Sequence, residues 1–216
     1  MSVKKEFIEF MIDSGVLLFG DFVTKSGRNT PYFINTGNYR TGEQIRKLGS
    51  YYARVIKEQI PETPDILFGP AYKGIPLSVA AASALFEDYG INCEYSFNRK
   101  EAKDHGEGNI LVGGKPEDGK KIVIIEDVVT AGSSVRETLP LLRAAGDVIV
   151  KDMVISVDRM EKGVGGKSAT EEIKEEFGID THSIVTIKDI AEYAFANLSP
   201  ELAGRIADYQ KEYCVL

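Results

Sequence analysis

The chain is poor in the features that mark secreted and membrane-spanning proteins. Its 216 residues contain two cysteines, Cys93 and Cys214, which form no CxxC unit, so we expect two reduced thiols and no disulfide framework. No apolar run reaches the roughly 18 residues that a membrane helix needs. The opening residues mix lysine and glutamate with apolar positions, unlike a signal peptide. A cytoplasmic protein is therefore expected.

A basic excess is also missing. The formal net charge is −7, from 26 Lys and Arg against 33 Asp and Glu. Broad nucleic-acid-binding surfaces usually carry the opposite balance, so neither a nucleic acid nor a membrane is an expected partner. A small anionic ligand remains compatible with this charge, because one pocket can be basic in an acidic protein.

The chain does have an ordinary globular composition, 43% hydrophobic and 27% charged, over a length that suits one α/β unit. Short β-branched runs alternate with longer helical patterns, which predicts a central, mostly parallel sheet flanked by helices. We expect a single domain over residues 1–216, with a small hood in about residues 1–40 and a core in about residues 60–190. The predicted strands cover residues 65–68, 92–97, 121–125, 148–157 and 184–187. The predicted helices cover residues 5–15, 75–89 and 134–145, with others beginning at residues 41 and 200.

Two helix starts have the pattern of a capping box, Thr41 with Gln44 and Ser134 with Glu137. Residues 98–119 are rich in glycine and charge and have no regular pattern. A loop this long in a compact domain is often functional, so we interpret it as a mobile loop.

The strongest functional signal is residues 122–134, which read IVIIEDVVTAGSS. A buried strand ends in Glu126 and Asp127, and a short loop then opens a helix. In open parallel sheets, ligands bind beyond the carboxyl ends of the strands. The helix N-terminus offers unpaired N–H groups, Gly132 lets an anion approach the backbone, and the loop hydroxyls can donate as well.

The two carboxylates need a different partner, because they would repel phosphate. They suit the hydroxyls of a ribose, or a cation, so the whole pattern predicts a site for a ribose 5-phosphate group. It contains neither the GxxxxGK[ST] loop nor the dinucleotide GxGxxG. The alternative is a strand, a turn and a capped helix without a ligand, which is the preferred reading for Ser134 taken alone.

This segment resembles the phosphoribosyl pyrophosphate motif of type I phosphoribosyltransferases. The resemblance implies that the acidic pair contacts the ribose hydroxyls, with Asp127 also catalytic, and that the loop holds the 5-phosphate. The residues so implicated are Glu126, Asp127, Val128, Val129, Thr130, Ala131, Gly132, Ser133 and Ser134.

Residues 98–108, NRKEAKDHGEG, form a basic cluster between glycines and acids, which is either a solvated loop or a lid that brings cations to a leaving pyrophosphate. They resemble the catalytic loop of orotate phosphoribosyltransferases, which closes over the site of the neighbouring subunit in a homodimer. The resemblance implies catalytic roles for Lys103 and His105. It also implies phosphoribosyl pyrophosphate contacts from Arg99 and Lys100.

Residues 22–37, FVTKSGRNTPYFINTG, place Lys25 and Arg28 near Phe33, a pairing that suits a planar anionic heterocycle. The alternative is an aromatic loop that packs on the core. The stretch resembles the orotate-binding segment of the same family. This implies that Phe33 and Ile34 lie against the base and that Lys25 lies near both substrates.

Two shorter segments follow strands. Residues 69–74, GPAYKG, are either an ordinary turn or a pyrophosphate site, and the resemblance implies the second for Tyr72 and Lys73. Arg159 is either a surface residue or a bidentate partner for a carboxylate, and the resemblance implies that it binds the orotate carboxylate, with Thr130 also near the base. His182 has no assigned role and is expected to be a surface or capping residue.

Taken together, the resemblance to orotate phosphoribosyltransferases runs over about residues 7–195. It implies a type I phosphoribosyltransferase fold and a magnesium-dependent reaction that makes orotidine 5'-phosphate and pyrophosphate for pyrimidine biosynthesis. Mg²⁺ would be held mainly through substrate and water, with no direct protein ligand. A purine phosphoribosyltransferase and a non-catalytic phosphoribosyl pyrophosphate sensor remain alternatives. Residues 22–37 and Arg159 argue against the first, and the lysine-bearing loop argues against the second.

Overall fold

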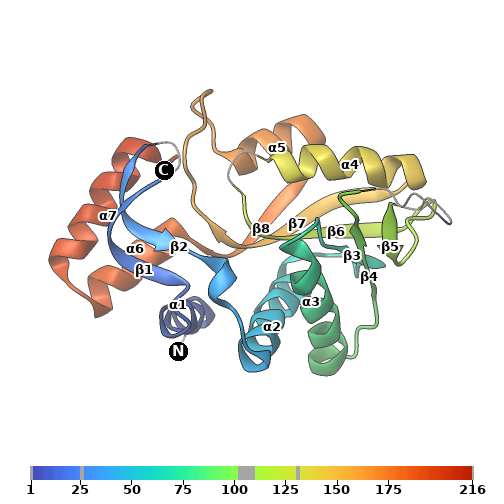
Figure 1. The fold of residues 1–216 in the computed structure, drawn as a ribbon, viewed down its shortest axis with the longest axis horizontal. Helices are drawn as coiled ribbons and strands as arrows, with labels where there is room; N and C mark the ends of the chain where they lie inside the picture. The colour runs from blue at the N-terminus through green and yellow to red at the C-terminus, as the bar shows by residue number, and fades with distance from the viewer. Residues whose placement is uncertain (1, 25–26, 102–109, 130–131, 216) are drawn as a thin grey trace.

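A six-stranded sheet with the strand order β5-β4-β3-β6-β7-β8 forms the centre of the molecule (Figure 1). The computed structural model describes residues 2–24, 27–101, 110–129 and 132–215. All neighbouring strands are parallel except β4 and β5, which confirms the prediction of a mostly parallel sheet. The strands are β3 (Ile66–Phe68), β4 (Glu94–Asn98), β5 (Leu111–Gly113), β6 (Lys121–Val128), β7 (Ile149–Asp158) and β8 (Asp180–Thr186).

Helices cover both faces of this sheet. Figure 1 shows α2 (Gly42–Gln59) and α3 (Gly74–Tyr89) on one face, and α4 (Ser133–Ala145) and α5 (Ala169–Phe177) on the other. Successive side chains of β6 alternate between these faces. Val123 and Ile125 join the core on the α2 and α3 side, while Ile122 and Ile124 join the core on the α4 and α5 side. A strand buried on both faces explains the unbroken apolar run in its sequence.

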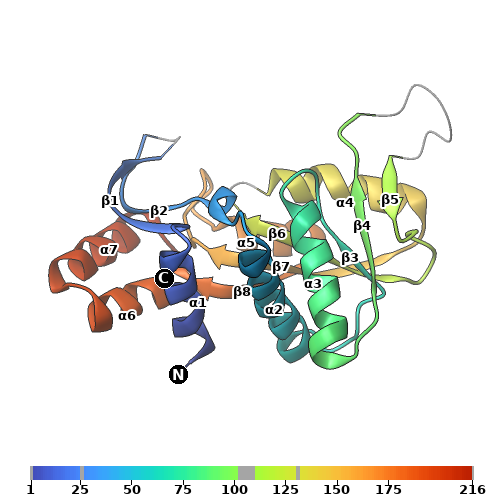
Figure 2. The same ribbon diagram turned by 60° about the horizontal axis from the view of Figure 1, so that its bottom comes forward.

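A smaller unit stands beside one end of the sheet (Figures 1 and 2). It combines an antiparallel hairpin with three helices, two of which come from the C-terminal part of the chain. These elements are β1 (Leu17–Val23), β2 (Asn29–Ile34), α1 (Val3–Asp13), α6 (Ile187–Asn197) and α7 (Pro200–Tyr213). We call this unit the hood from here on; it includes α6 and α7 as well as the predicted hood of about residues 1–40. The start of α7 at Pro200, with Ser199 as its N-cap, was predicted from the sequence, whereas α6 was not.

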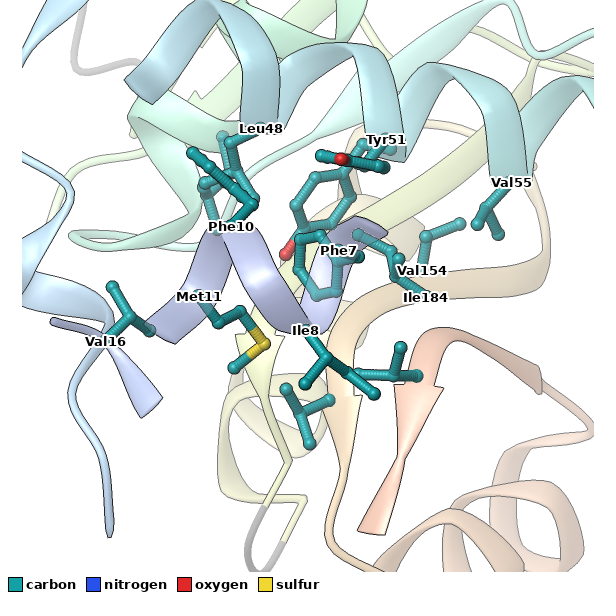
Figure 3. Packing of buried hydrophobic residues seen from close by; sticks show 14 of the residues in the cluster. Phe7, Ile8, Phe10, Met11, Val16, Leu48, Tyr51, Val55, Val154 and Ile184 are labelled. Atoms are coloured by element: carbon teal, nitrogen blue, oxygen red, sulfur yellow. The ribbon is translucent and has the colours of Figure 1, made fainter. Parts of the chain in front are cut away.

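Aromatic packing joins the hood to the helices of the core. Figure 3 shows Phe7 and Phe10 of α1 beside Tyr51 of α2. The rings of Phe7 and Tyr51 meet edge to face with centroids 4.8 Å apart, and Phe10 stacks on Tyr39 at 5.3 Å. Such pairs stabilise a fold beyond the apolar area they bury. The segment after β2, which contains Tyr39, is therefore held against α1.

Three local predictions differ from the structure. The segment 98–119 is partly regular, because β5 lies within it and pairs with β4. Helix α5 was not predicted from the sequence, although Ser168 and Glu171 form a capping box at its start. His182, expected to be a surface or capping residue, is a half-buried residue of β8 whose Nε2 lies 2.8 Å from Asp152 Oδ1.

The capping box of Thr41 and Gln44 at the start of α2 is confirmed, with both reciprocal hydrogen bonds present. No helix in the part of the chain that the structure describes is long and apolar enough to cross a membrane.

Candidate active site

The predicted phosphate site lies where β6 gives way to α4. Gly132 is the N-cap of α4 and has a left-handed backbone, with φ of 67°, which glycine adopts without strain. No side-chain cap is present among the described residues, so the predicted capping box of Ser134 and Glu137 is wrong. The reason is that the N-cap is Gly132, two residues before Ser134, and the helix begins at Ser133. Glu137 instead lies 3.5 Å from the Lys100 ammonium. Among the described residues, no N-cap side chain occupies the first-turn N–H groups of α4, which is the arrangement that suits an anionic ligand.

Glu126 and Asp127 point to opposite faces of the sheet, because they are consecutive residues of one strand. Glu126 is only 8% exposed, and this burial raises the pKa of its carboxyl from 4.5 to about 7. The Ser134 hydroxyl partly opposes the shift by favouring the charged form. Near neutral pH, Glu126 is therefore divided between its neutral and charged forms.

Asp127 faces the hood and the α2 side of the sheet. Its Oδ2 accepts a hydrogen bond from Thr36 Oγ1 at 2.6 Å and forms an ion pair with Lys73 Nζ at 2.9 Å. Lys73 Nζ also lies 3.3 Å from Thr36 Oγ1, so the three groups are in mutual contact. Lys73 comes from the turn after β3 and Thr36 from the segment after β2. Three elements that are distant in sequence therefore meet at one carboxylate oxygen.

The main chain around the acidic pair is held by two side-chain hydroxyls. Tyr52 of α2 donates to the Glu126 carbonyl oxygen at 2.6 Å, and Ser156 of β7 donates to the Asp127 carbonyl oxygen at 2.6 Å. Both donors are buried. A site whose backbone is fixed in this way loses little freedom when a ligand binds.

A cleft of about 260 Å³ opens above this junction and joins the two predicted phosphate-binding segments. It is lined by Pro70, Ala71, Tyr72, Lys73, Glu126, Asp127, Val128, Val129, Gly132, Ser133 and Ser134. The predicted ribose and pyrophosphate residues that the structure describes in these two segments therefore share one cavity. Lys73 supplies a cation at its rim, with a side chain that is 67% exposed.

The turn after β3 is shaped by close backbone contacts. A Cβ at Gly69 would lie 2.1 Å from the Gly74 carbonyl oxygen, so only glycine fits there. The peptide between Ala71 and Tyr72 is cis. The Ala71 N–H donates to Asn98 Oδ1 at 3.0 Å. This bond ties the turn to the end of β4, where the predicted catalytic loop begins.

The predicted base-binding residues lie on β2 of the hood. Phe33 is 42% exposed and stacks on Phe22, with ring centroids 5.5 Å apart. Ile34 is half-buried and packs on the core. Arg28 is directed to the C-terminal segment, where it lies 5.0 Å from the Tyr213 ring centroid and donates to the Lys162 carbonyl oxygen at 3.2 Å. Phe33 thus keeps one exposed face for a planar ligand.

Arg159 follows β7 and is not a free surface residue. Its Nη2 donates to Glu161 Oε1 at 2.6 Å, and its guanidinium lies 5.6 Å from the centroid of the Tyr32 ring. Its buried Nε has no hydrogen-bond partner among the described residues. A buried donor without a partner is costly, and a ligand carboxylate is one group that could satisfy it.

Several predicted site residues lie outside the described residues, namely Lys25, Lys103, His105, Thr130 and Ala131. The structure does describe the start of the predicted catalytic loop. The Arg99 N–H donates to the Ile110 carbonyl oxygen at 2.8 Å, which extends the pairing of β4 with β5, and Lys100 lies beside Glu137.

Four residues that support the site were not singled out from the sequence, namely Thr36, Tyr52, Asn98 and Ser156. Each contacts the site through one hydroxyl or amide placed by the fold. Thr36 and Asn98 lie within the segments 22–37 and 98–108 described above, but nothing in their spacing marked them as contacts of the site. Tyr52 and Ser156 are common residue types that stand in no motif.

A magnesium ion would find few protein ligands here. Mg²⁺ prefers six oxygen ligands in an octahedron. No group of three or more His, Cys, Asp or Glu side chains suited to a metal occurs in the described ranges. Glu126 and Asp127 offer carboxylate oxygens at the cleft.

Known proteins share both the sequence and the fold. Residues 35–181 match the model of the phosphoribosyl transferase domain. An orotate phosphoribosyltransferase of Clostridium acetobutylicum is 55% identical, over 98% of both chains, and one of Clostridium beijerinckii is 54% identical over 97% of both. The crystal structure of an orotate phosphoribosyltransferase from Francisella tularensis superposes with a TM-score of 0.89 at 36% identity, covering 100% of this chain and 98% of that one. The chain therefore belongs to the orotate phosphoribosyltransferase family, with the type I phosphoribosyltransferase fold.

Proposed function

We propose that the chain transfers the 5-phosphoribosyl group from phosphoribosyl pyrophosphate to orotate. The products are orotidine 5'-phosphate and pyrophosphate, a step of pyrimidine biosynthesis that we place in the cytoplasm. One observation carries the proposal: a strand-end acidic pair, an uncapped helix N-terminus and the Lys73 ammonium line the same cleft. Relatives that bear the name of this activity match the chain over nearly its whole length.

Each part of the cleft suits one part of phosphoribosyl pyrophosphate. The first turn of α4, with Gly132, Ser133 and Ser134, suits the 5-phosphate because its N–H groups are uncapped. The carboxylates of Glu126 and Asp127 suit the ribose hydroxyls. Tyr72 and Lys73, which line the same cleft, suit the pyrophosphate, and Arg99 and Lys100 would join them when the loop closes.

The base would bind against the hood. The exposed face of Phe33 offers a stacking surface, with Ile34 beside it, and Lys25 and Thr130 would complete the pocket. Arg159 would receive the orotate carboxylate, which would satisfy its unpartnered Nε.

The reaction is a displacement at the anomeric carbon of the ribose, and it needs no protein nucleophile. A ring nitrogen of orotate forms the new bond to the anomeric carbon as the bond from that carbon to pyrophosphate breaks, through a transition state with positive charge on the ribose. The proton of that nitrogen is released to solvent or to the leaving pyrophosphate. The protein positions the two substrates and balances charge, with Asp127 near the sugar and Lys73, Lys103 and His105 near the leaving group. Magnesium, when bound, supplies further positive charge beside the pyrophosphate. Loop closure excludes water, which would otherwise compete.

A homodimer that shares the catalytic loop between subunits is part of the proposal. Its support is an exposed apolar surface on α3 and β4, where Phe86 is 62%, Tyr95 43% and Tyr89 40% exposed. Exposed aromatic side chains are enriched at protein interfaces. A measured solution mass of one chain for the fully active protein would refute this part.

The decisive experiment measures pyrophosphate release with orotate, adenine or hypoxanthine as the base, in the presence of Mg²⁺ and phosphoribosyl pyrophosphate. Of the three bases, we expect only orotate to give pyrophosphate release.

Removal of Mg²⁺ with a chelator should abolish the reaction. The Lys103→Ala variant should turn over about 10² times more slowly, as lost electrostatic stabilisation predicts. Turnover of a purine without turnover of orotate would overturn the assignment, and no release with any base would favour a sensor.

A further inference from the structure

The hydrogen bond from Thr36 to Asp127 connects the hood to the acidic pair of the core. Its length of 2.6 Å is that of a strong bond between a hydroxyl and a charged oxygen. Thr36 begins a short 3₁₀ turn, Thr36–Asn38, two residues after Ile34. The segment that carries the proposed base-binding residues therefore ends on the carboxylate proposed to bind the sugar.

The position of Thr36 is set by contacts that do not involve Asp127. The Asn35 N–H donates to the Val16 carbonyl oxygen at 2.8 Å, and Asn38 Nδ2 donates to the Gly15 carbonyl oxygen at 2.6 Å. These bonds lie on either side of Thr36 and fasten the turn to the α1–β1 connection. The threonine hydroxyl is thus presented by a fixed piece of backbone, so that it can orient a partner.

Among the residues that the structure describes, the hydrogen bonds and the ion pair of the Asp127 side chain are on one oxygen. Thr36 and Lys73 both reach Oδ2, and Lys73 also lies within hydrogen-bonding distance of the Thr36 hydroxyl. A hydroxyl can donate to the carboxylate and accept from the ammonium at once, which a methyl group cannot do. With Oδ2 occupied in this way, Oδ1 is the oxygen left to accept from a ligand in the cleft that Asp127 lines.

We propose that Thr36 is a positioning residue for sugar recognition. Its hydroxyl holds Asp127 Oδ2 toward the hood and so directs Oδ1 to a ribose hydroxyl. The inference rests on the proposed function, because it needs Asp127 to contact the sugar. It adds that the orientation of this carboxylate is decided by the base-binding side of the site rather than by β6 alone.

The test compares Thr36→Val with Thr36→Ser, using ribose 5-phosphate as the probe and calorimetry as the measurement. Valine keeps the shape and removes the hydroxyl, whereas serine keeps the hydroxyl. We expect valine to weaken binding about tenfold, the usual cost of one hydrogen bond to a charged group. We expect serine to bind within about twofold of the parent. In steady-state kinetics, valine should raise the KM for phosphoribosyl pyrophosphate more than the KM for orotate.

Thr41→Val is the matched control, because it removes a hydroxyl five residues away. That hydroxyl caps α2 through the Gln44 N–H and lies outside the cleft. The control should lower the thermal midpoint without weakening ribose 5-phosphate binding. If Thr36→Val does not fold, Thr36→Ala provides the same comparison with serine.

The outcomes separate this inference from the function on which it rests. Asp127→Asn should weaken ribose 5-phosphate binding, and parent-like binding by that variant would remove the sugar-site assignment itself. If Asp127→Asn weakens binding and Thr36→Val does not, the sugar site stands and the role of Thr36 is refuted. Equal weakening by valine and serine would also refute it, because the hydroxyl would then not be the group that matters.

Discussion

The Arg159 guanidinium donates to the Glu161 carboxylate at 2.6 Å, so the arginine proposed to bind the substrate already holds a carboxylate of its own chain. The same Glu161 oxygen accepts from Tyr209 of α7, also at 2.6 Å. The C-terminal helix is thereby linked to the base-binding side of the site through one side chain.

Glu161→Gln should therefore destabilise the fold. Both members of the ion pair are largely buried, with side chains about one-fifth exposed, and the amide would leave Arg159 without its counter-charge. We expect a loss of about 2–3 kcal/mol in the free energy of unfolding, measured by urea denaturation. Glu175→Gln is the matched control, because its ion pair with Lys167 is exposed and screened by water, and it should contribute little to stability. Equal losses in the two variants would contradict the prediction.

Glu126 should make stability depend on pH. Its folded pKa of about 7 lies above the ordinary 4.5, so the folded state holds the proton more tightly than the unfolded state. The tighter proton binding therefore adds its full amount to the free energy of unfolding below pH 4.5. This added stability, on the order of 3 kcal/mol, is lost as the pH rises to about 7.

In Glu126→Gln that decline should be absent, while the stability at pH 5 stays near that of the parent, because the amide resembles the protonated acid. Urea denaturation at pH 5 and at pH 7.5 measures both quantities. If the free energy of unfolding of the variant falls with pH as steeply as that of the parent, groups other than Glu126 cause the pH dependence.

The Tyr52 hydroxyl should support the acidic pair through the main chain. Tyr52→Phe removes a fully buried donor and leaves the Glu126 carbonyl oxygen without that bond. The expected cost is about 1–3 kcal/mol in the free energy of unfolding. Amide hydrogen exchange should also become faster near residues 126–128.

Gly69 should tolerate no side chain. A Cβ there would meet the Gly74 carbonyl oxygen at 2.1 Å, and the turn that carries Lys73 would have to move. We expect Gly69→Ala to lose more than about 3 kcal/mol of stability and to bind pyrophosphate poorly. Gly42→Ala is the control, because no atom lies within 4 Å of the added methyl group and alanine favours the helix. Wild-type stability in Gly69→Ala would show that the turn can relax.

The parallel sheet could be predicted because buried strands with helices on both faces need continuous apolar runs, as in Ile122–Ile125. The junction that follows was also readable, since Gly132 and the adjoining acids and hydroxyls are consecutive in the chain. The capping box at Ser134 could not be judged from spacing. The sequence does not show which residue takes the left-handed N-cap conformation, and in the fold it is Gly132.

Sequence alone determined elements whose physics is local, namely the main strands and helices of the core, the Thr41 cap and the strand-to-helix junction after Asp127, although it did not reveal α5, α6 or β5. Only the tertiary structure decided which distant groups meet. It placed Thr36 and Lys73 on Asp127, Glu161 on Arg159, and two C-terminal helices in the hood. The reason is that a hydrogen bond or ion pair between remote residues depends on how the layers pack. No sequence pattern around a single threonine or glutamate predicts which residue it will contact.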